Sequence, residues 1–142
     1  MTNYFADALM DLYLSAVSYT NPTTIAIGLS TTSPGAAGSL TGEPTTSNGY
    51  NRVTITKDNA TKWSAAASGA KTNGNGAITF PVSTGAWSTG ASALAYWFIA
   101  DSATPGAGNV LLYGPCSPAS DAVNATGITV SIPVSSLTIN MA

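Results

Sequence analysis

Beyond Pro22, the sequence is a series of short segments in which apolar and polar residues alternate, separated by turn residues. Alternation places every second side chain on one face of an extended strand, whereas a helix requires apolar residues three or four positions apart. The expected strands cover residues 24–29, 52–56, 78–80, 93–99, 110–113, 128–132 and 137–139, with Trp63 as a candidate for one more. This pattern predicts an all-β fold, a jelly-roll-like β-sandwich of about seven or eight strands.

One of these segments, residues 93–99, is apolar without interruption and includes three aromatic residues. Such a run is typical of a central strand that is buried on both faces. Two connecting segments, residues 31–49 and 64–76, are long and rich in small and hydroxyl side chains. Long loops on a small β-domain are usually functional or mobile. The Asn-Gly pairs in residues 48–49 and 73–76 are expected in turns, because both residue types tolerate a positive φ.

Residues 3–19 are predicted to form a helix, because apolar residues recur about every four positions there. Thr2 or Asn3 is placed to cap its first turn. The Asn21-Pro22 pair is expected to end it, since the residue before a proline avoids helical dihedral angles.

The predicted helix divides the chain into an N-terminal helix or arm, residues 1–21, and a β-sandwich domain, residues 22–142. The large apolar side chains of the helix are spread around much of its circumference, so they cannot all pack on one small sheet. We expect some of them to contact another chain; the alternative is that the helix closes one end of the sandwich as ordinary core. The expected interface residues are Tyr4, Phe5, Leu9, Leu12 and Tyr13, together with Trp87, which lies in a turn-rich stretch and is expected to be exposed.

Charge is scarce, and this excludes several classes of function. Charged residues make up 7% of the chain, against about 25% in an average domain. There is no histidine, so a Ser–His–Asp triad, a Cys–His pair and a histidine-bound metal are impossible. The cations are Arg52, Lys57, Lys62 and Lys71, and the net charge is −2, so no binding to nucleic acid is expected. A surface this poor in charge suits a protein that associates with copies of itself.

Membrane insertion, secretion and an internal disulfide are not expected either. The longest apolar run, residues 93–100, is too short to span a bilayer. Met1 does not open a secretory signal peptide, because the first residues carry two aspartates and no Lys or Arg. Cys116 is the single cysteine, so it has no partner within the chain.

Four motifs resemble functional sites, and each has a plainer interpretation. Residues 68–72 faintly resemble a phosphate-binding loop, but Ala65 and Ala70 stand where the motif requires its two glycines. The acids are Asp7, Asp11, Glu43, Asp58, Asp101 and Asp121. Asp7 and Asp11 are expected to keep a helix soluble, and the others to hydrogen-bond within turns. The alternatives are a catalytic carboxylate pair and a calcium-binding loop. The N-glycosylation pattern occurs at Asn59-Ala60-Thr61 and Asn124-Ala125-Thr126, but about two or three matches arise by chance in a sequence this rich in Asn, Ser and Thr. The tryptophans Trp63, Trp87 and Trp97 offer a sugar-binding face, although Trp97 is expected in the core. We therefore expect no catalytic residue, no metal site and no cofactor.

Several short patterns follow one another in a fixed order along nearly the whole chain. They include Asn3-Tyr4-Phe5-Ala6-Asp7, Ile25-Ala26-Ile27-Gly28-Leu29-Ser30-Thr31, Gly49-Tyr50-Asn51-Arg52, Gly85-Ala86-Trp87-Ser88 and Trp97-Phe98-Ile99-Ala100-Asp101. In these patterns the chain resembles small virion proteins of tailed bacteriophages that are labelled phage tail fibre or capsid decoration proteins. The resemblance implies that Tyr50 points inward and that Arg52 pairs with a loop acid, of which Glu43 is the nearest in sequence. An unpaired arginine on an edge strand is the alternative.

The resemblance implies a non-enzymatic virion structural protein, assembled in the cytoplasm of the bacterial host. Within that class we favour a capsid decoration or cement protein, because a fibrous protein needs a long shaft and this chain has no repeat to build one. The expected partners are other copies of the chain, as a homotrimer, and virion proteins such as the major capsid protein. The alternatives are a small tail or baseplate fibre module and a carbohydrate-binding module for host recognition.

Overall fold

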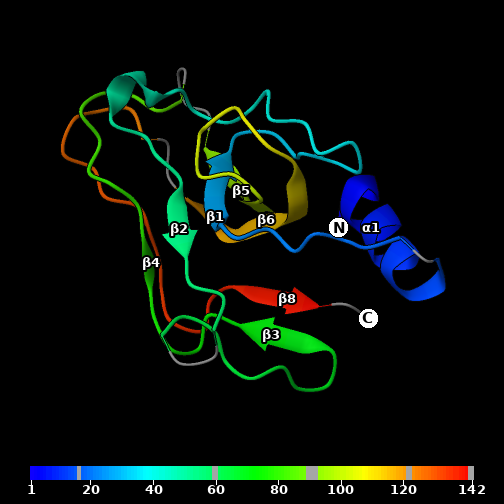
Figure 1. The fold of residues 1–142 in the computed structure, drawn as a ribbon. Helices are drawn as coiled ribbons and strands as arrows, with labels where there is room; N and C mark the ends of the chain where they lie inside the picture. The colour runs from blue at the N-terminus through cyan, green and yellow to red at the C-terminus, as the bar shows by residue number, and fades with distance from the viewer. Residues whose placement is uncertain (16, 59–60, 89–92, 121–122, 141–142) are drawn as a thin grey trace.

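The computed structural model describes residues 1–142 except 16, 59–60, 89–92, 121–122 and 141–142. The described part contains one α-helix, α1 (Asn3–Leu14), a short 3-10 helix, η1 (Thr46–Asn48), and strands in antiparallel sheets (Figure 1). The strands are β1 (Ile25–Ser30), β2 (Val53–Ile55), β3 (Ala70–Thr72), β4 (Ile78–Thr79), β5 (Leu94–Ala100), β6 (Val110–Ser120), β7 (Ser131–Ile132) and β8 (Thr138–Asn140). The prediction of an all-β fold with one N-terminal helix is confirmed.

Four strands form the main sheet in the order β2-β1-β5-β6, and each neighbouring pair is antiparallel. The central strand β5 buries side chains on both faces: Trp97 and Ile99 lie on one, Phe98 and Ala100 on the other. This confirms the expectation from the uninterrupted apolar run. β6 continues past the predicted residues 110–113, because it keeps pairing with β5 beyond Pro115.

A two-stranded ribbon supplies the second layer. β3 pairs with β8, and β4 pairs with β7. Backbone hydrogen bonds from Phe80 to Val130 and from Ser83 to Ile128 continue the ladder beyond β4. The two halves of the chain's second layer are therefore parts of one long antiparallel ribbon that is interrupted in its middle.

Asn73 fills this interruption. It is fully buried, and its side-chain nitrogen donates to the carbonyl oxygen of Pro133 (2.7 Å) while its Oδ1 accepts from the backbone nitrogen of Leu137 (2.9 Å). Gly49 has the positive φ expected of an Asn-Gly turn, whereas neither glycine of residues 73–76 does. The turn at residues 73–76 is held instead by the side chain of Asn73.

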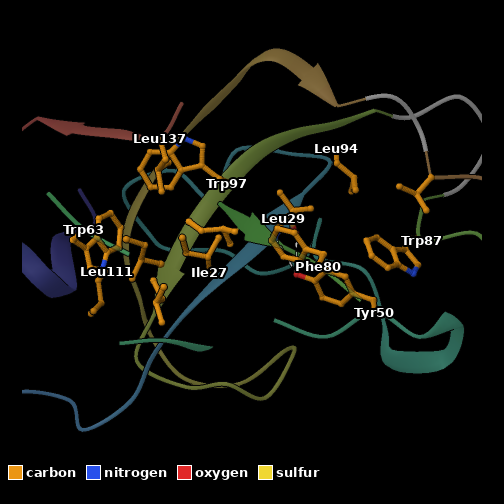
Figure 2. Packing of buried hydrophobic residues seen from close by; sticks show 14 residues of the cluster. Ile27, Leu29, Tyr50, Trp63, Phe80, Trp87, Leu94, Trp97, Leu111 and Leu137 are labelled. Atoms are coloured by element: carbon orange, nitrogen blue, oxygen red, sulfur yellow. Dashed lines mark hydrogen bonds between the residues drawn. The ribbon is translucent and has the colours of Figure 1, made fainter. Parts of the chain in front are cut away.

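The main hydrophobic core lies between the sheet and the ribbon (Figure 2). Ile27, Leu29 and Trp97 face it from the sheet, and Phe80 and Leu137 face it from the ribbon. Burying one such side chain contributes roughly 1.5–3 kcal/mol. This shared core is what holds the two layers together.

A smaller core covers the opposite face of the sheet. Phe98, Ala100 and Val110 form it, with Leu40 from the long loop packed against them. Gly28 pairs directly with Phe98 across β1 and β5. The absence of a side chain at Gly28 leaves the space in which the aromatic ring lies.

The helix ends five residues earlier than predicted. Ser15 is extended and caps the helix by donating its backbone N–H to Asp11, so the chain turns back toward β1 well before Pro22. Val17 and Tyr19 are apolar residues within the predicted helix, but they lie in the segment that leads from α1 to β1. In Figure 1 α1 lies beside the main sheet and away from β2 and β4.

Candidate interaction surface

Thr2 fastens the start of α1 to the edge strand β6. Its hydroxyl accepts a hydrogen bond from the backbone N–H of Phe5, which caps the helix, and donates to the carbonyl oxygen of Val110 at 2.5 Å. The backbone N–H of Thr2 donates to Leu111 (3.1 Å). Of the two candidate caps, Thr2 is therefore the one used. The side chain is almost completely buried, so the helix is fixed at its first turn.

The rest of α1 is only loosely covered. None of its residues is buried. Of the expected interface residues, Tyr4, Leu12 and Tyr13 are exposed, while Phe5 and Leu9 are half-buried toward the domain. Two further apolar residues of this helix, Met10 and Leu14, were missed by the sequence reasoning; they are 59% and 79% exposed, beside 80% for Tyr13. The sequence did contain a signal for them, because Met10 and Leu14 are four positions apart and therefore share one side of the predicted helix.

An apolar groove of about 560 Å³ separates the inner side of α1 from the sheet and the ribbon. Phe5 and Leu9 form one wall, and Leu112 of β6 and Ile139 of β8 form the other. Lys57 and Lys71 line the groove as well, together with Asp58. The groove is thus an apolar hollow with two cations and one acid among its lining residues.

All four cationic side chains tie loops together through backbone carbonyl oxygens. Arg52 donates to Ser102 and Ala107, Lys57 to Pro22, Lys62 to Ala77 and Lys71 to Ser64. These cations come from different elements and point at local carbonyl groups, so they do not form one basic stripe of the kind that follows a nucleic-acid backbone.

Arg52 and Glu43 form a buried ion pair at the opposite side of the sheet from the main core. The guanidinium donates from Nε to Oε1 and from Nη2 to Oε2 of Glu43, both at 2.7 Å. Arg52 is 5% exposed, and its guanidinium lies over the ring of Phe98, 5.1 Å from the ring centre. The pairing implied by the Gly-Tyr-x-Arg segment is confirmed, and the alternative of an unpaired edge-strand arginine is wrong.

The same ion pair joins two loops to the sheet. Glu43 accepts a hydrogen bond from the hydroxyl of Tyr50 (3.1 Å) and another from the backbone N–H of Gly106 (2.8 Å). Tyr50 is buried, and its hydroxyl accepts from the backbone N–H of Leu29 (3.0 Å). Burial, reinforced by the negative charge of Glu43, raises the pKa of Tyr50 far above its usual value. Residues 31–49 and 101–109 are therefore held in place by side chains that lie beneath them.

Residues 1–140 match the family of the podophage GP4 fiber I protein gp80. The chain belongs to this family. No curated protein matches the chain. The resemblance to bacteriophage tail fibre proteins that the sequence patterns suggested is thereby confirmed, and the chain is a member of a bacteriophage virion fibre family.

The three tryptophans of this gp80-family chain are buried. Trp87 was expected to be exposed, and this is wrong: it is 6% exposed, its ring packs edge-on against Tyr50, and its Nε1 donates to the carbonyl oxygen of Asn48 at 2.8 Å. Trp63 and Trp97 lie in the same core (Figure 2). None of the three offers a face to a sugar, which removes the observation behind the carbohydrate-binding alternative.

Among the described residues of the gp80-family chain, Asp7 and Asp11 lie together on α1, whereas Glu43, Asp58 and Asp101 are each engaged in a different loop. Asp58 accepts from Thr61, Asp101 accepts from Asn109, and Glu43 is held by Arg52. Asp121 lies outside the described residues. Within the described residues, no three side chains of His, Cys, Asp or Glu are grouped to hold a metal ion, and no helix has the length and apolarity to cross a bilayer. Cys116 is half-buried, and burial raises the pKa of its thiol to about 11.

Proposed function

We propose that this chain is a small, non-catalytic fibre module that attaches to the virion and to its own copies, as a homotrimer, through α1. The observation that supports this proposal is the outer side of α1. Met10, Tyr13 and Leu14 are more than half exposed on one short helix, although each is a side chain whose burial contributes roughly 1.5–3 kcal/mol. A helix that is capped and fastened at its first turn, yet leaves three such side chains in water, is suited to contact a second chain.

The remaining surface supports a structural role rather than a chemical one. Glu43, Asp58 and Asp101 are engaged in different loops, the cations are engaged with carbonyl groups, and the loops around Glu43 are held in place from below. A rigid scaffold with few charges can pack against copies of itself with little electrostatic repulsion. Membership of a phage fibre family supports the same role.

A capsid decoration protein, which the sequence alone favoured, is the second candidate. The observation that favours it is the shape of the fold: one sheet and one ribbon share a single core, and the sequence has no repeat from which a shaft is built. The number of copies in each virion separates the two. A number close to that of the major capsid protein supports decoration, and a number that matches the symmetry of the tail supports a fibre module.

The attachment role of α1 is tested with paired surface variants. Tyr13→Ser with Leu14→Ser removes exposed apolar side chains from α1. Val82→Ser with Val134→Ser removes two exposed apolar side chains outside α1, which are 55% and 50% exposed, and serves as the control. We expect the α1 variant to sediment as a monomer and to be lost from virions, while the control stays trimeric and is incorporated.

Deletion of residues 1–20 provides a second, stronger test of the same role. The main core contains no residue of this segment among its buried members, so we expect the truncated chain to remain folded and to become monomeric. If it unfolds, the helix is part of the core and the proposal is wrong. If the wild-type chain is a monomer and the α1 variant enters virions as well as the control, the proposal is equally wrong.

A further inference from the structure

We propose that the partner of the apolar groove is α1 of a second copy of this chain. This inference rests on the proposed function, and it assigns both halves of the contact. One half is the outer face of α1, formed by Asp7, Met10, Asp11, Tyr13 and Leu14. The other half is the groove between the inner side of α1, the sheet and the ribbon.

The two surfaces are complementary in polarity. The outer face has exposed apolar side chains at positions 10, 13 and 14, a spacing that places them on one side of a helix. The groove of about 560 Å³ is lined by apolar side chains, among them Leu112 and Ile139, and is open to solvent. Met10 and Leu14 are exposed apolar side chains, of the same chemical kind as the side chains that line the groove. Each surface alone leaves apolar area in water, and joining them removes it from both.

The two surfaces are also complementary in charge, and this identifies the occupant. The helix α1 carries Asp7 and Asp11 and contains neither Lys nor Arg. Both aspartates are exposed; they line a shallow hollow between α1 and residues 17–20, where Asp11 also accepts a hydrogen bond from the hydroxyl of Ser15. The groove is lined by Lys57 and Lys71, two of the four cations in the chain, against the single acid Asp58. Charged residues make up only 7% of the chain, yet two of the six acids lie on α1 and two of the four cations line the groove.

Such a contact is able to form the closed ring that a homotrimer requires. The helix of one copy and the groove of the next are different surfaces, so the contact is heterologous, and a heterologous contact closes when its rotation divides a full turn. The helix α1 also forms one wall of its own groove through Phe5 and Leu9. Docking would therefore place two α1 helices side by side, and a chain that loses its own helix would lose both halves of the contact.

A charge exchange between two variants tests the assignment. The first variant is Asp7→Lys with Asp11→Lys, and the second is Lys57→Glu with Lys71→Glu. We expect each variant alone to associate about tenfold more weakly or worse, because two attractions become two repulsions at a partly exposed contact. Mixed in equal amounts, the two variants should form mixed oligomers more readily than either variant forms its own, because a ring of three then has two attractive contacts and one repulsive contact; sedimentation equilibrium with one variant fluorescently labelled measures this.

Two controls keep the test decisive. Thermal unfolding of each variant shows whether it is folded, since Lys57 and Lys71 also bond to backbone carbonyls. If the lysine variant unfolds, a photo-crosslinking residue at position 14 decides instead. In a mixture of isotopically labelled and unlabelled chains, we expect cross-links from position 14 of one chain to groove residues of another, such as Leu112 and Ile139.

The outcomes separate this inference from the proposed function. An oligomer that persists unchanged in the Asp7→Lys, Asp11→Lys variant, or cross-links that reach another surface, would overturn the groove assignment and leave attachment through α1 intact. Cross-links from position 14 only to a different virion protein would overturn it in the same way. A wild-type chain that neither self-associates nor needs α1 for incorporation overturns both.

Discussion

The ring of Phe98 lies where a side chain on Gly28 would have to be: a Cβ atom built on Gly28 would come within 2.2 Å of Cζ of that ring. The two residues are direct partners on neighbouring strands. A similar relation exists on the other face of β5, where a Cβ atom on Gly114 would lie 2.7 Å from Cζ2 of Trp97. Large aromatic residues next to each other in β5 thus require glycine on both adjacent strands.

Replacing Gly28 by alanine should destabilise the protein by about 1–3 kcal/mol, because the ring of Phe98 must move within a packed core. Urea unfolding measures the change. The contact is tested by a double-mutant cycle: in a Phe98→Leu background, the cost of Gly28→Ala should fall clearly. Gly35→Ala is the control, since a Cβ atom there meets nothing within 4 Å, and its cost should not depend on residue 98. Equal costs of Gly28→Ala in both backgrounds would contradict the prediction.

Breaking the buried ion pair should be more costly. Arg52→Met leaves the carboxylate of Glu43 buried without its two charged hydrogen bonds, and we expect a loss of about 3–5 kcal/mol in the free energy of unfolding. Replacing both partners together, Arg52→Met with Glu43→Leu, should cost less than the sum of the single changes, because neither charge remains buried alone. Additive costs in urea unfolding would show that the two side chains do not stabilise each other.

Thr2→Val should loosen α1 without unfolding the sheet. The substitution removes the helix cap and the hydrogen bond to Val110, at a cost of about 1–2 kcal/mol. Hydrogen exchange should quicken at the amides of α1, while the amides of β5 keep their protection. Equal loss of protection in α1 and β5 would mean that the helix and the sheet unfold as one unit, contrary to this expectation.

The thiol of Cys116 should make stability depend on alkaline pH. Its pKa is raised by burial from 9.0 in the unfolded chain to about 11, so the folded state favours the neutral thiol. This contribution is complete below pH 9 and is lost as the pH rises toward 11. We expect alkylation of the folded protein at pH 8.5 to be about tenfold slower, or more, than alkylation in denaturant.

Cys116→Ser is the matched variant for this pH dependence. Burial also raises the pKa of Tyr50 above its ordinary value of 10.0, so Tyr50 contributes a further loss of protein stability above pH 10. The pH dependence of the wild-type protein alone therefore does not separate the effect of Cys116 from that of Tyr50. The difference in unfolding free energy between wild type and Cys116→Ser should therefore change between pH 8 and pH 11. A constant difference would mean that burial does not suppress ionisation of this thiol.

The strands were predictable where local sequence alone decides the structure. The uninterrupted run in β5 indicated a strand that is buried on both faces. The inward Tyr50 and the pairing of Arg52 with Glu43 did not come from local sequence but were implied by the resemblance to phage tail fibre proteins. The length of α1 was overestimated, because apolar spacing continues through Val17 and Tyr19 although the backbone has already turned at Ser15.

Features that depend on distant partners could not be predicted in the same way. Trp87 follows a glycine in a turn-rich stretch, yet Tyr50 and the carbonyl oxygen of Asn48 bring it into the core. Asn73 is surrounded by turn residues in sequence, but its hydrogen-bonding partners belong to the strand segments around Pro133 and Leu137. For the interaction surface, sequence periodicity located the helix but gave no indication of the groove, which requires residues from β6, β8 and the loop after β2.

The hydrogen bond between Thr2 and Val110 spans 108 positions of the chain, and this has a consequence during translation. A ribosome adds residues at about 5–20 per second, so the binding partners of Thr2 emerge roughly 5–20 s after Thr2 itself. Throughout that interval α1 lacks both its anchor on β6 and the apolar surface of Leu111 and Leu112. The helix is thus the first element to be synthesised and one of the last to find its place in the nascent protein.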